Sequence, residues 1–319
     1  MSDSILRLDD VRIAHRHTGE EIVRGVTFDL RPGHVIGIVG ESGSGKTLTC
    51  RAILGILPRL FEIAGGTVEL FGRDITGFTQ RDWEQLRGVS ITAVFQDPGS
   101  YLNPSLRIGP QLAEALRVRG GLKRREAKRR VLTLLEDVRL RDPELVYRSY
   151  PHELSGGMLQ RVLIASAISL EPQILIADEV TTALDVTIQA EVLDLLLDLK
   201  EQHGLALIVV SHDLAVVAQT CDDVLVLRHG EVVEQGHAKR ILFAPEHEYT
   251  RLLIDEHDIY GLDRFRTAED ASGDERVPTR FARSTSGEEG AAAAARRSLS
   301  EGAGGDRDEG RIAEEVHHG

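Results

Sequence analysis

Eight residues near the start of the chain decide the fold: Gly40, Glu41, Ser42, Gly43, Ser44, Gly45, Lys46 and Thr47. They follow a short apolar run, Val35 to Val39, of the kind that forms a buried strand in a parallel sheet. A helical pattern comes next, so the stretch lies between a strand and a helix. In that setting the spacing G-x-x-x-x-G-K-T is typical of a loop that binds nucleotide phosphates.

The glycines of this loop allow the backbone to wrap a polyphosphate with its N–H groups pointing inward. The helix that follows adds the positive end of its dipole. We therefore expect residues 40–48, Leu48 included, to hold the phosphates of ATP. Lys46 would reach the β- and γ-phosphates, and the Thr47 hydroxyl would bind Mg²⁺. The motif alone indicates only a nucleotide phosphate, because kinases, GTPases and motor ATPases share it.

Two carboxylates end a second buried-strand candidate, Ile174 to Ala177. Open α/β sheets bind their ligands at the carboxyl ends of their strands, which is where these two residues stand. Asp178 is expected to complete the magnesium shell through water. Glu179 is expected to polarise the water that attacks the γ-phosphate.

Two further polar residues are candidates for the same chemistry. His212 follows the apolar run Leu205 to Val210 and could hydrogen-bond the γ-phosphate and the attacking water. Gln96, before Asp97-Pro98, could reach both magnesium and water. On its own, such a histidine is more often structural, and such a glutamine is a turn residue.

The stretch from Leu154 to Arg161 reads Leu-Ser-Gly-Gly-Met-Leu-Gln-Arg. Glycines at a helix start expose N–H groups to a phosphate, and a serine hydroxyl is a further donor. Here the chain resembles the ABC ATPases, whose signature reads L-S-G-G-Q. The order of motifs matches that family across about residues 5–245, and it runs through the loop, Gln96, the signature, Asp178-Glu179, Ala183-Leu184-Asp185 and His212.

The resemblance implies an α/β fold, the P-loop NTPase fold of ABC ATPases. Its parts would be a mostly parallel core sheet, an N-terminal antiparallel β subdomain and a helical subdomain at about 97–165, all within residues 1–264. It also implies a head-to-tail dimer, in which Ser155, Gly156 and Gly157 serve the nucleotide of the partner subunit. Asp185 would lie near the same interface. His15 stands where many members stack an aromatic ring on adenine.

Finer features resemble the peptide and nickel importer branch of the family: Phe95-Gln96-Asp97-Pro98, Leu102-Asn103-Pro104 and Thr181 to Ala190. Within the branch, Gly45 to Cys50 and Ser155 to Arg161 are most similar to nickel- or metallophore-import ATPases. The resemblance thus implies an ATPase that drives uptake of nickel or a metal chelate. The alternatives are a di- or oligopeptide importer of the same branch and a soluble ABC ATPase outside transport. Met158 and Val180 depart from the general pattern, which has glutamine and proline there.

The implied partners are two multi-span permease subunits, a second ABC ATPase subunit and, indirectly, an extracytoplasmic solute-binding protein. The net charge of −13 argues against a nucleic-acid binder. The apolar runs are far shorter than the roughly 20 residues that cross a bilayer, and acidic residues stand where a signal peptide would be basic. We therefore expect a peripheral protein at the cytoplasmic face of the membrane. Cys50 and Cys221 are expected to be reduced and semi-buried.

Periodicity predicts the remaining elements. Alternation over residues 5–8 and 23–30 indicates strands of a small sheet. Residues 111–140 have a helical pattern, with a basic stretch at 123–130 that is best explained as a solvated helix face. A helix is expected over 188–199 between two parallel strands, and Pro58 is expected to end the helix after the loop. Residues 265–319 carry few large apolar side chains, which predicts a disordered tail.

Overall fold

The computed structural model describes residues 4–96, 98–180, 186–212, 214, 217 and 220–258. All of these fall within one unit of the chain, Met1–Val277. The predicted site residue Asp185 and the predicted tail, 265–319, lie outside the described residues.

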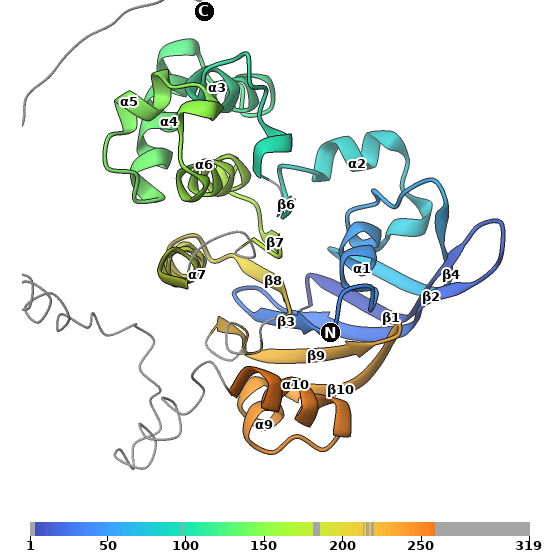
Figure 1. Cartoon of the computed structure of the whole chain (residues 1–319). Helices are drawn as coiled ribbons and strands as arrows, with labels where there is room; N and C mark the ends of the chain where they lie inside the picture. Colours follow the sequence, from blue (N-terminus) through green and yellow to red (C-terminus); the bar gives the residue numbers. More distant parts are fainter. Residues whose placement is uncertain are drawn as a thin grey trace, which may run out of the picture. The chain divides into compact units, whose positions relative to one another are not determined.

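The described residues form two sheets (Figure 1). A four-stranded antiparallel sheet has the order β2-β1-β4-β5, and a six-stranded sheet has the order β10-β9-β3-β8-β7-β6. In the second sheet only β10 is antiparallel to its neighbour. The strands are β1 Leu6–His15, β2 Glu21–Leu30, β3 Val35–Val39, β4 Phe61–Leu70, β5 Arg73–Asp74, β6 Ile91–Val94, β7 Ile174–Asp178, β8 Ala206–Ser211, β9 Asp223–Arg228 and β10 Glu231–His237.

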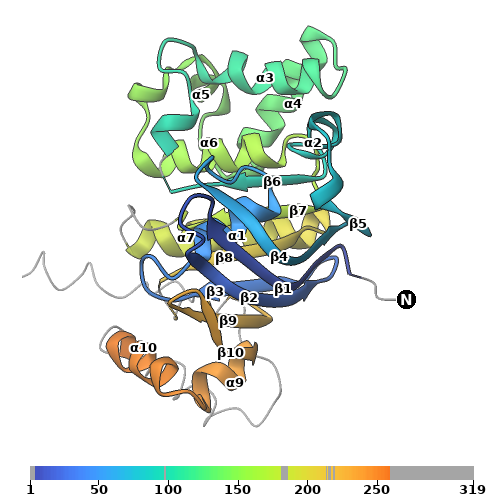
Figure 2. The same ribbon diagram turned by 90° about the vertical axis from the view of Figure 1, so that its right-hand side faces the viewer.

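Helices cover these sheets and form a helical part after β6. Figure 2 shows α3 to α6 beyond β6 at one end of the sheet and α9 and α10 beside β9 and β10 at the other. The helices are α1 Lys46–Ile53, α2 Gln80–Leu86, α3 Ile108–Val118, α4 Arg124–Asp137, α5 Pro143–Arg148, α6 Gly156–Ile168, α7 Val186–His203, α9 Ala238–Phe243 and α10 Glu248–Asp258. The expected fold class is confirmed: the core sheet is mostly parallel, and an antiparallel sheet and helical parts accompany it.

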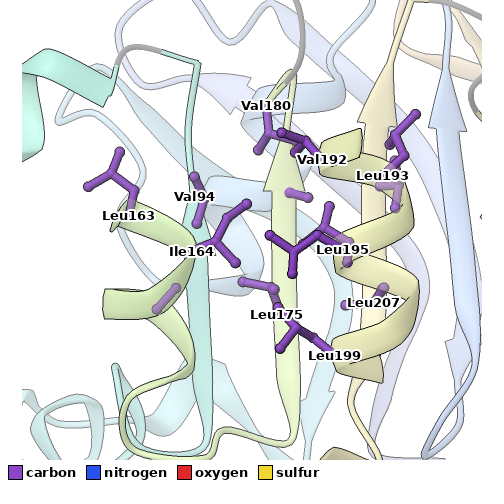
Figure 3. Close-up of a cluster of buried hydrophobic side chains, with 14 of the residues drawn as sticks. Val94, Leu163, Ile164, Leu175, Val180, Val192, Leu193, Leu195, Leu199 and Leu207 are labelled. Atoms are coloured by element: carbon purple, nitrogen blue, oxygen red, sulfur yellow. The ribbon is translucent and has the colours of Figure 1, made fainter. Parts of the chain in front are cut away.

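The central strands are buried on both faces, and their side chains alternate between two apolar clusters. In β3, Val35 and Val39 pack on one face while Ile36 and Ile38 pack on the other. The first face carries α6 and α7, and in Figure 3 Ile164 of α6 and Leu195 and Leu199 of α7 lie beside Leu175 of β7. The second face carries α1 and the antiparallel sheet. Because both faces are covered, these strands read as continuous apolar runs in the sequence.

Three sequence expectations about local structure need correction. The helix after the loop ends at Ile53, with Leu54 as its C-cap, before Pro58. Gly55 there adopts a left-handed φ of +62°, and N–H groups of the turn bond back to the last helical carbonyls. The helical pattern of 111–140 is two helices, α3 and α4, because Gly121 has a φ of +68° between them. The helix expected over 188–199 extends from Val186 to His203.

The two cysteines are buried rather than semi-buried. Cys50, in α1, is 0% exposed on one face of the six-stranded sheet, and Cys221 is 9% exposed against the opposite face. Neither forms a disulfide. Burial raises the pKa of Cys50 well above its usual value and raises that of Cys221 to about 12, so both thiols stay protonated at neutral pH.

The close packing around Gly37 of β3 predicts that a larger side chain there lowers the stability of the protein. A Cβ on Gly37 would lie 2.3 Å from Val217 Cγ1 and 2.9 Å from Cys221 Sγ. We expect Gly37→Ala to lower the free energy of unfolding by about 1–3 kcal/mol through overpacking. Gly77→Ala is the matched control, because no atom lies within 4 Å of its added Cβ. Urea denaturation of both variants measures the difference, and equal stabilities would contradict this packing account.

Candidate functional site

Four parallel strands bring the predicted site residues to one edge of the six-stranded sheet. In the ladder, Val39 pairs with Ser211, Asp178 pairs with Val210, and Val94 pairs with Ala177. The residues that follow these strand ends therefore share that edge. They include Gly40, Glu179, His212 and Gln96, which the sequence places far apart.

The loop between β3 and α1 has the backbone that a phosphate cradle needs. Gly40, Gly43 and Gly45 have φ values of +148°, +84° and +103°, a region that side chains rarely adopt. Gly45 is the N-cap of α1, so the first N–H groups of that helix open toward the loop. Inside the loop, the Ser44 hydroxyl is buried and has no hydrogen-bond partner among the described residues. An orphaned donor in a glycine-lined loop fits a phosphate oxygen.

Lys46 lies at the bottom of this loop and is 4% exposed. Its Nζ donates to Gly40 O at 2.7 Å and to Glu41 O at 2.9 Å. Burial lowers the pKa of Lys46, and the carboxylates of Glu179 and Asp178 oppose that shift. The ammonium group is thus held on backbone carbonyls between the loop and the acidic strand end.

Thr47 and Asp178 place two oxygen atoms side by side at the sheet edge. The Thr47 hydroxyl donates to Asp178 Oδ1 at 3.3 Å. Asp178 is 3% exposed, and burial raises its pKa while the hydrogen bond from Thr47 lowers it and the charge of Glu179 raises it further. A carboxylate and a hydroxyl at this separation fit a hard cation with oxygen ligands, and a cation would offset the burial of the carboxylate.

Glu179 has a strained backbone, with a φ of +51°. Such a conformation costs a non-glycine residue on the order of 1–3 kcal/mol and is concentrated at functional sites. The Glu179 N–H donates to Val210 O at 3.0 Å, which ties the residue to β8. His212 Nδ1 lies 4.0 Å from Glu179 Oε1. Val180, which replaces the usual proline, is buried in the apolar cluster, so packing holds this turn.

Gln96 and His15 lie at the ends of two strands that belong to different sheets. Gln96 is exposed directly after β6, at the shared sheet edge. His15 ends β1 and is half-buried, with its ring edge-on to Phe61 at 5.7 Å between centroids. Its Nδ1 accepts the N–H groups of His17 and Thr18 at 3.3 Å. The ring is therefore fixed in orientation at the end of a strand.

The signature segment opens α6, in the helical part. Ser155 is the N-cap, and its Oγ accepts the Met158 N–H at 3.3 Å, which leaves the hydroxyl proton for an external acceptor. Ser155 and Gly156 are exposed, whereas Gly157 is buried, and a Cβ on it would lie 2.9 Å from Ile188 of α7. In Figure 1, strands β6 and β7 lie between α1 and α6. The phosphate loop and the signature are thus on different parts of the same chain.

One contact to the loop escaped sequence reasoning. The Glu41 N–H donates to the hydroxyl of Tyr249, in α10, at 3.0 Å. Nothing in the sequence pattern around Tyr249 indicates a partner 208 positions away.

The sequence has well-described relatives. A family model described as "ABC transporter" matches residues 23–182. The probable peptide ABC transporter ATP-binding protein y4tR of Sinorhizobium fredii is 45% identical over 251 residues, which are 77% of this chain and 75% of that protein. The dipeptide transport ATP-binding protein DppD of Escherichia coli is 39% identical over 270 residues, 83% and 82% of the two chains.

Solved structures with the same fold are ATP-binding cassettes. The structure of cbiO1 from Clostridium perfringens, part of an ABC transporter complex, has a TM-score of 0.67 at 26% identity and covers 84% of this chain and 100% of that one. The cassette MJ0796 in a dimeric post-hydrolysis state bound to ADP and Pi has a TM-score of 0.64 at 28% identity, covering 73% and 98%. No helix in the described residues is long and apolar enough to span a membrane.

Proposed function

Because this chain belongs to the ABC transporter family of ATP-binding proteins, we propose that it is the ATP-hydrolysing subunit of a peptide importer. Its ATPase activity is coupled to transport, as in the family. The observation that carries the proposal is the meeting of the glycine loop, Asp178, Glu179 and His212 at one sheet edge in a chain whose relatives are peptide-transport ATP-binding proteins.

In this proposal each residue has a distinct task on ATP. The N–H groups of residues 40–48 and the Lys46 ammonium bind the phosphates. Thr47, Asp178 and Gln96 would hold Mg²⁺, which when bound neutralises charge on the β- and γ-phosphates. Glu179 accepts a proton from the attacking water, and His212, 4.0 Å away, orients that water and the γ-phosphate. His15 would pack against the adenine.

The exposed start of α6 serves a second subunit in this proposal. The glycine loop surrounds a triphosphate from one side only, and the donors of Ser155 and Gly156 are exposed elsewhere on the chain. A head-to-tail pair would bring these donors of one subunit onto the nucleotide of the other. The dimeric state of the similar cassette MJ0796 supports this arrangement.

We further propose that the helical part contacts the permease subunits. A cavity of about 350 Å³ lies between β6 and the helices α3 and α6. Phe95, Tyr101, Leu102 and Ala115 line it, together with Arg119. Tyr101 is 55% exposed there, which is unusual for a large ring and suits an apolar segment of a membrane partner.

The cargo expected from the sequence, nickel or a metal chelate, is not supported by the comparisons. The relatives named above are described as peptide and dipeptide transport proteins, so the alternative that the sequence left open fits better. An oligopeptide transport ATP-binding protein, OppD of Salmonella typhimurium, is also 42% identical over 248 residues. We therefore propose a di- or oligopeptide as the cargo.

Uptake by cells that lack this chain tests the proposal. We expect loss of labelled dipeptide uptake, restored by the wild-type chain, while labelled nickel uptake stays unchanged. The Glu179→Gln variant, made at the same level, should fail to restore uptake. Loss of nickel uptake with normal dipeptide uptake would overturn the proposed cargo.

A further inference from the structure

One peptide unit of the nucleotide loop is hydrogen-bonded on both sides. The peptide between Gly40 and Glu41 accepts the Lys46 ammonium at its carbonyl oxygen, at 2.7 Å. Its N–H donates to the Tyr249 hydroxyl at 3.0 Å. Because a peptide group is planar, a contact that fixes the N–H also fixes the direction of the carbonyl. Tyr249 and Lys46 thus bind opposite edges of the same planar peptide group.

The tyrosine itself is held firmly. Its side chain is 2% exposed, and the Arg228 guanidinium lies 4.7 Å from the centre of its ring. The segment before α10 is anchored on β10, where the buried Glu234 carboxylate accepts the N–H groups of Glu246 at 2.8 Å and of His247 at 3.1 Å. These contacts fix the position of the Tyr249 hydroxyl relative to the loop.

The same side of the loop rests on the neighbouring strands. A Cβ on Gly40 would lie 2.0 Å from Leu227 O of β9, so only glycine allows this approach. The Gly230 N–H, in the turn between β9 and β10, donates to Ser44 O at 3.1 Å. Three points of the loop are thus supported by residues 227–249, and Tyr249 is the one that uses a side chain.

The Tyr249 hydroxyl is protonated at neutral pH, and in this form it can accept the Glu41 N–H. Burial raises the pKa of Tyr249, and the hydrogen bond from the Glu41 N–H only partly opposes that shift. A neutral phenol keeps a lone pair for the N–H and its own proton for the Glu41 carboxylate, whose charge and hydrogen bond raise the pKa of Tyr249 further.

We propose that Tyr249 is a positioning residue for the nucleotide loop. Through the Gly40–Glu41 peptide it fixes the carbonyl that holds Lys46 and keeps the loop ready for the triphosphate. The inference rests on the proposed role of residues 40–48 in phosphate binding. Since a loop fixed in advance loses less freedom on binding, Tyr249 strengthens ATP binding without touching ATP.

Tyr249→Phe is the test, because it keeps the ring and removes one oxygen atom. We expect the Kd for ATP, measured by calorimetry on the full chain in a Glu179→Gln background, to rise about three- to tenfold, the loss typical of one hydrogen bond. Hydrogen exchange at the Glu41 amide should become faster. In the assembled transporter, the KM for ATP should rise while kcat changes less than about twofold. Tyr147→Phe, a half-buried tyrosine of α5, is the matched control and should change none of these.

The outcomes separate this inference from the function on which it rests. Unchanged ATP affinity in Tyr249→Phe overturns the inference, even if the melting temperature falls or the amide exchanges faster, since Tyr249 would then be structural only. Lys46→Ala is measured beside it. If Lys46→Ala weakens binding and Tyr249→Phe does not, only the inference fails. If Lys46→Ala also leaves the Kd unchanged, the proposed role of the loop fails as well.

Discussion

Replacement of Glu179 by glutamine will lower the ATPase rate of the assembled transporter by about 10²–10⁴-fold, the usual contribution of a positioned general base. Glutamine has nearly the same shape but cannot accept the proton of the attacking water. The Glu179 backbone N–H is hydrogen-bonded to Val210 of β8, and its Oε1 lies 4.0 Å from His212 Nδ1. Because the substitution does not change the backbone hydrogen bond, we expect the surrounding geometry to stay intact. ATP affinity should stay within about threefold of wild type, because the lost charge acts on water.

Phosphate release in single-turnover experiments measures this effect. Glu201→Gln, an exposed glutamate at the end of α7, is the control and should hydrolyse ATP at the wild-type rate. A Glu179→Gln transporter with near wild-type turnover would show that another group takes the proton.

Ser155→Arg should prevent closure over the nucleotide of the partner subunit. Ser155 is the exposed N-cap of α6, where arginine adds bulk and removes the oxygen that accepts the Met158 N–H. We expect turnover of the complex to fall by at least about 10²-fold, comparable to the loss of transition-state donors elsewhere. ATP binding at the Lys46 loop of the same chain should be retained, because the two motifs lie on different parts of the chain.

Nucleotide trapping resolved by subunit checks this in the reconstituted complex. Thr76→Arg adds the same bulk and charge at another exposed hydroxyl residue and should have no effect. Loss of binding at the variant chain's own loop, with the partner's site unaffected, would mean that the signature acts on its own subunit. That result would end the two-subunit model.

The strands and the sheet edge could be predicted from the sequence because each depends on local pattern. Val35 to Val39 and Ile174 to Ala177 are apolar without interruption, as strands covered on both faces are. Parallel pairing then forces Gly40 and Glu179 to the same edge. The proposed roles of Lys46, Asp178 and Glu179 followed from residue type and strand order, whereas those of Ser155, Asp185 and His15 came from the family resemblance.

Features that depend on distant contacts or backbone conformation could not be predicted in this way. Pro58 is the obvious helix breaker, yet Gly55 ends the helix first through its left-handed φ. The strain at Glu179 and the hydrogen bond from Glu41 to Tyr249 are invisible in any local window. The cargo is harder still, because the ATP-binding subunit in this proposal never contacts it. Short motifs favoured nickel as the cargo, whereas similarity over 251 and 270 residues to peptide and dipeptide transport proteins favours peptides.

The most direct test of the account is transport by the purified complex in proteoliposomes. The complex would contain this chain, its permeases and its second ATPase subunit, with a peptide-loaded binding protein outside and ATP inside. We predict that labelled dipeptide accumulates, that ATP hydrolysis rises with it, and that both stop when this chain carries Glu179→Gln. Dipeptide accumulation that continues with Glu179→Gln in this chain would contradict the claim that its ATP hydrolysis drives import.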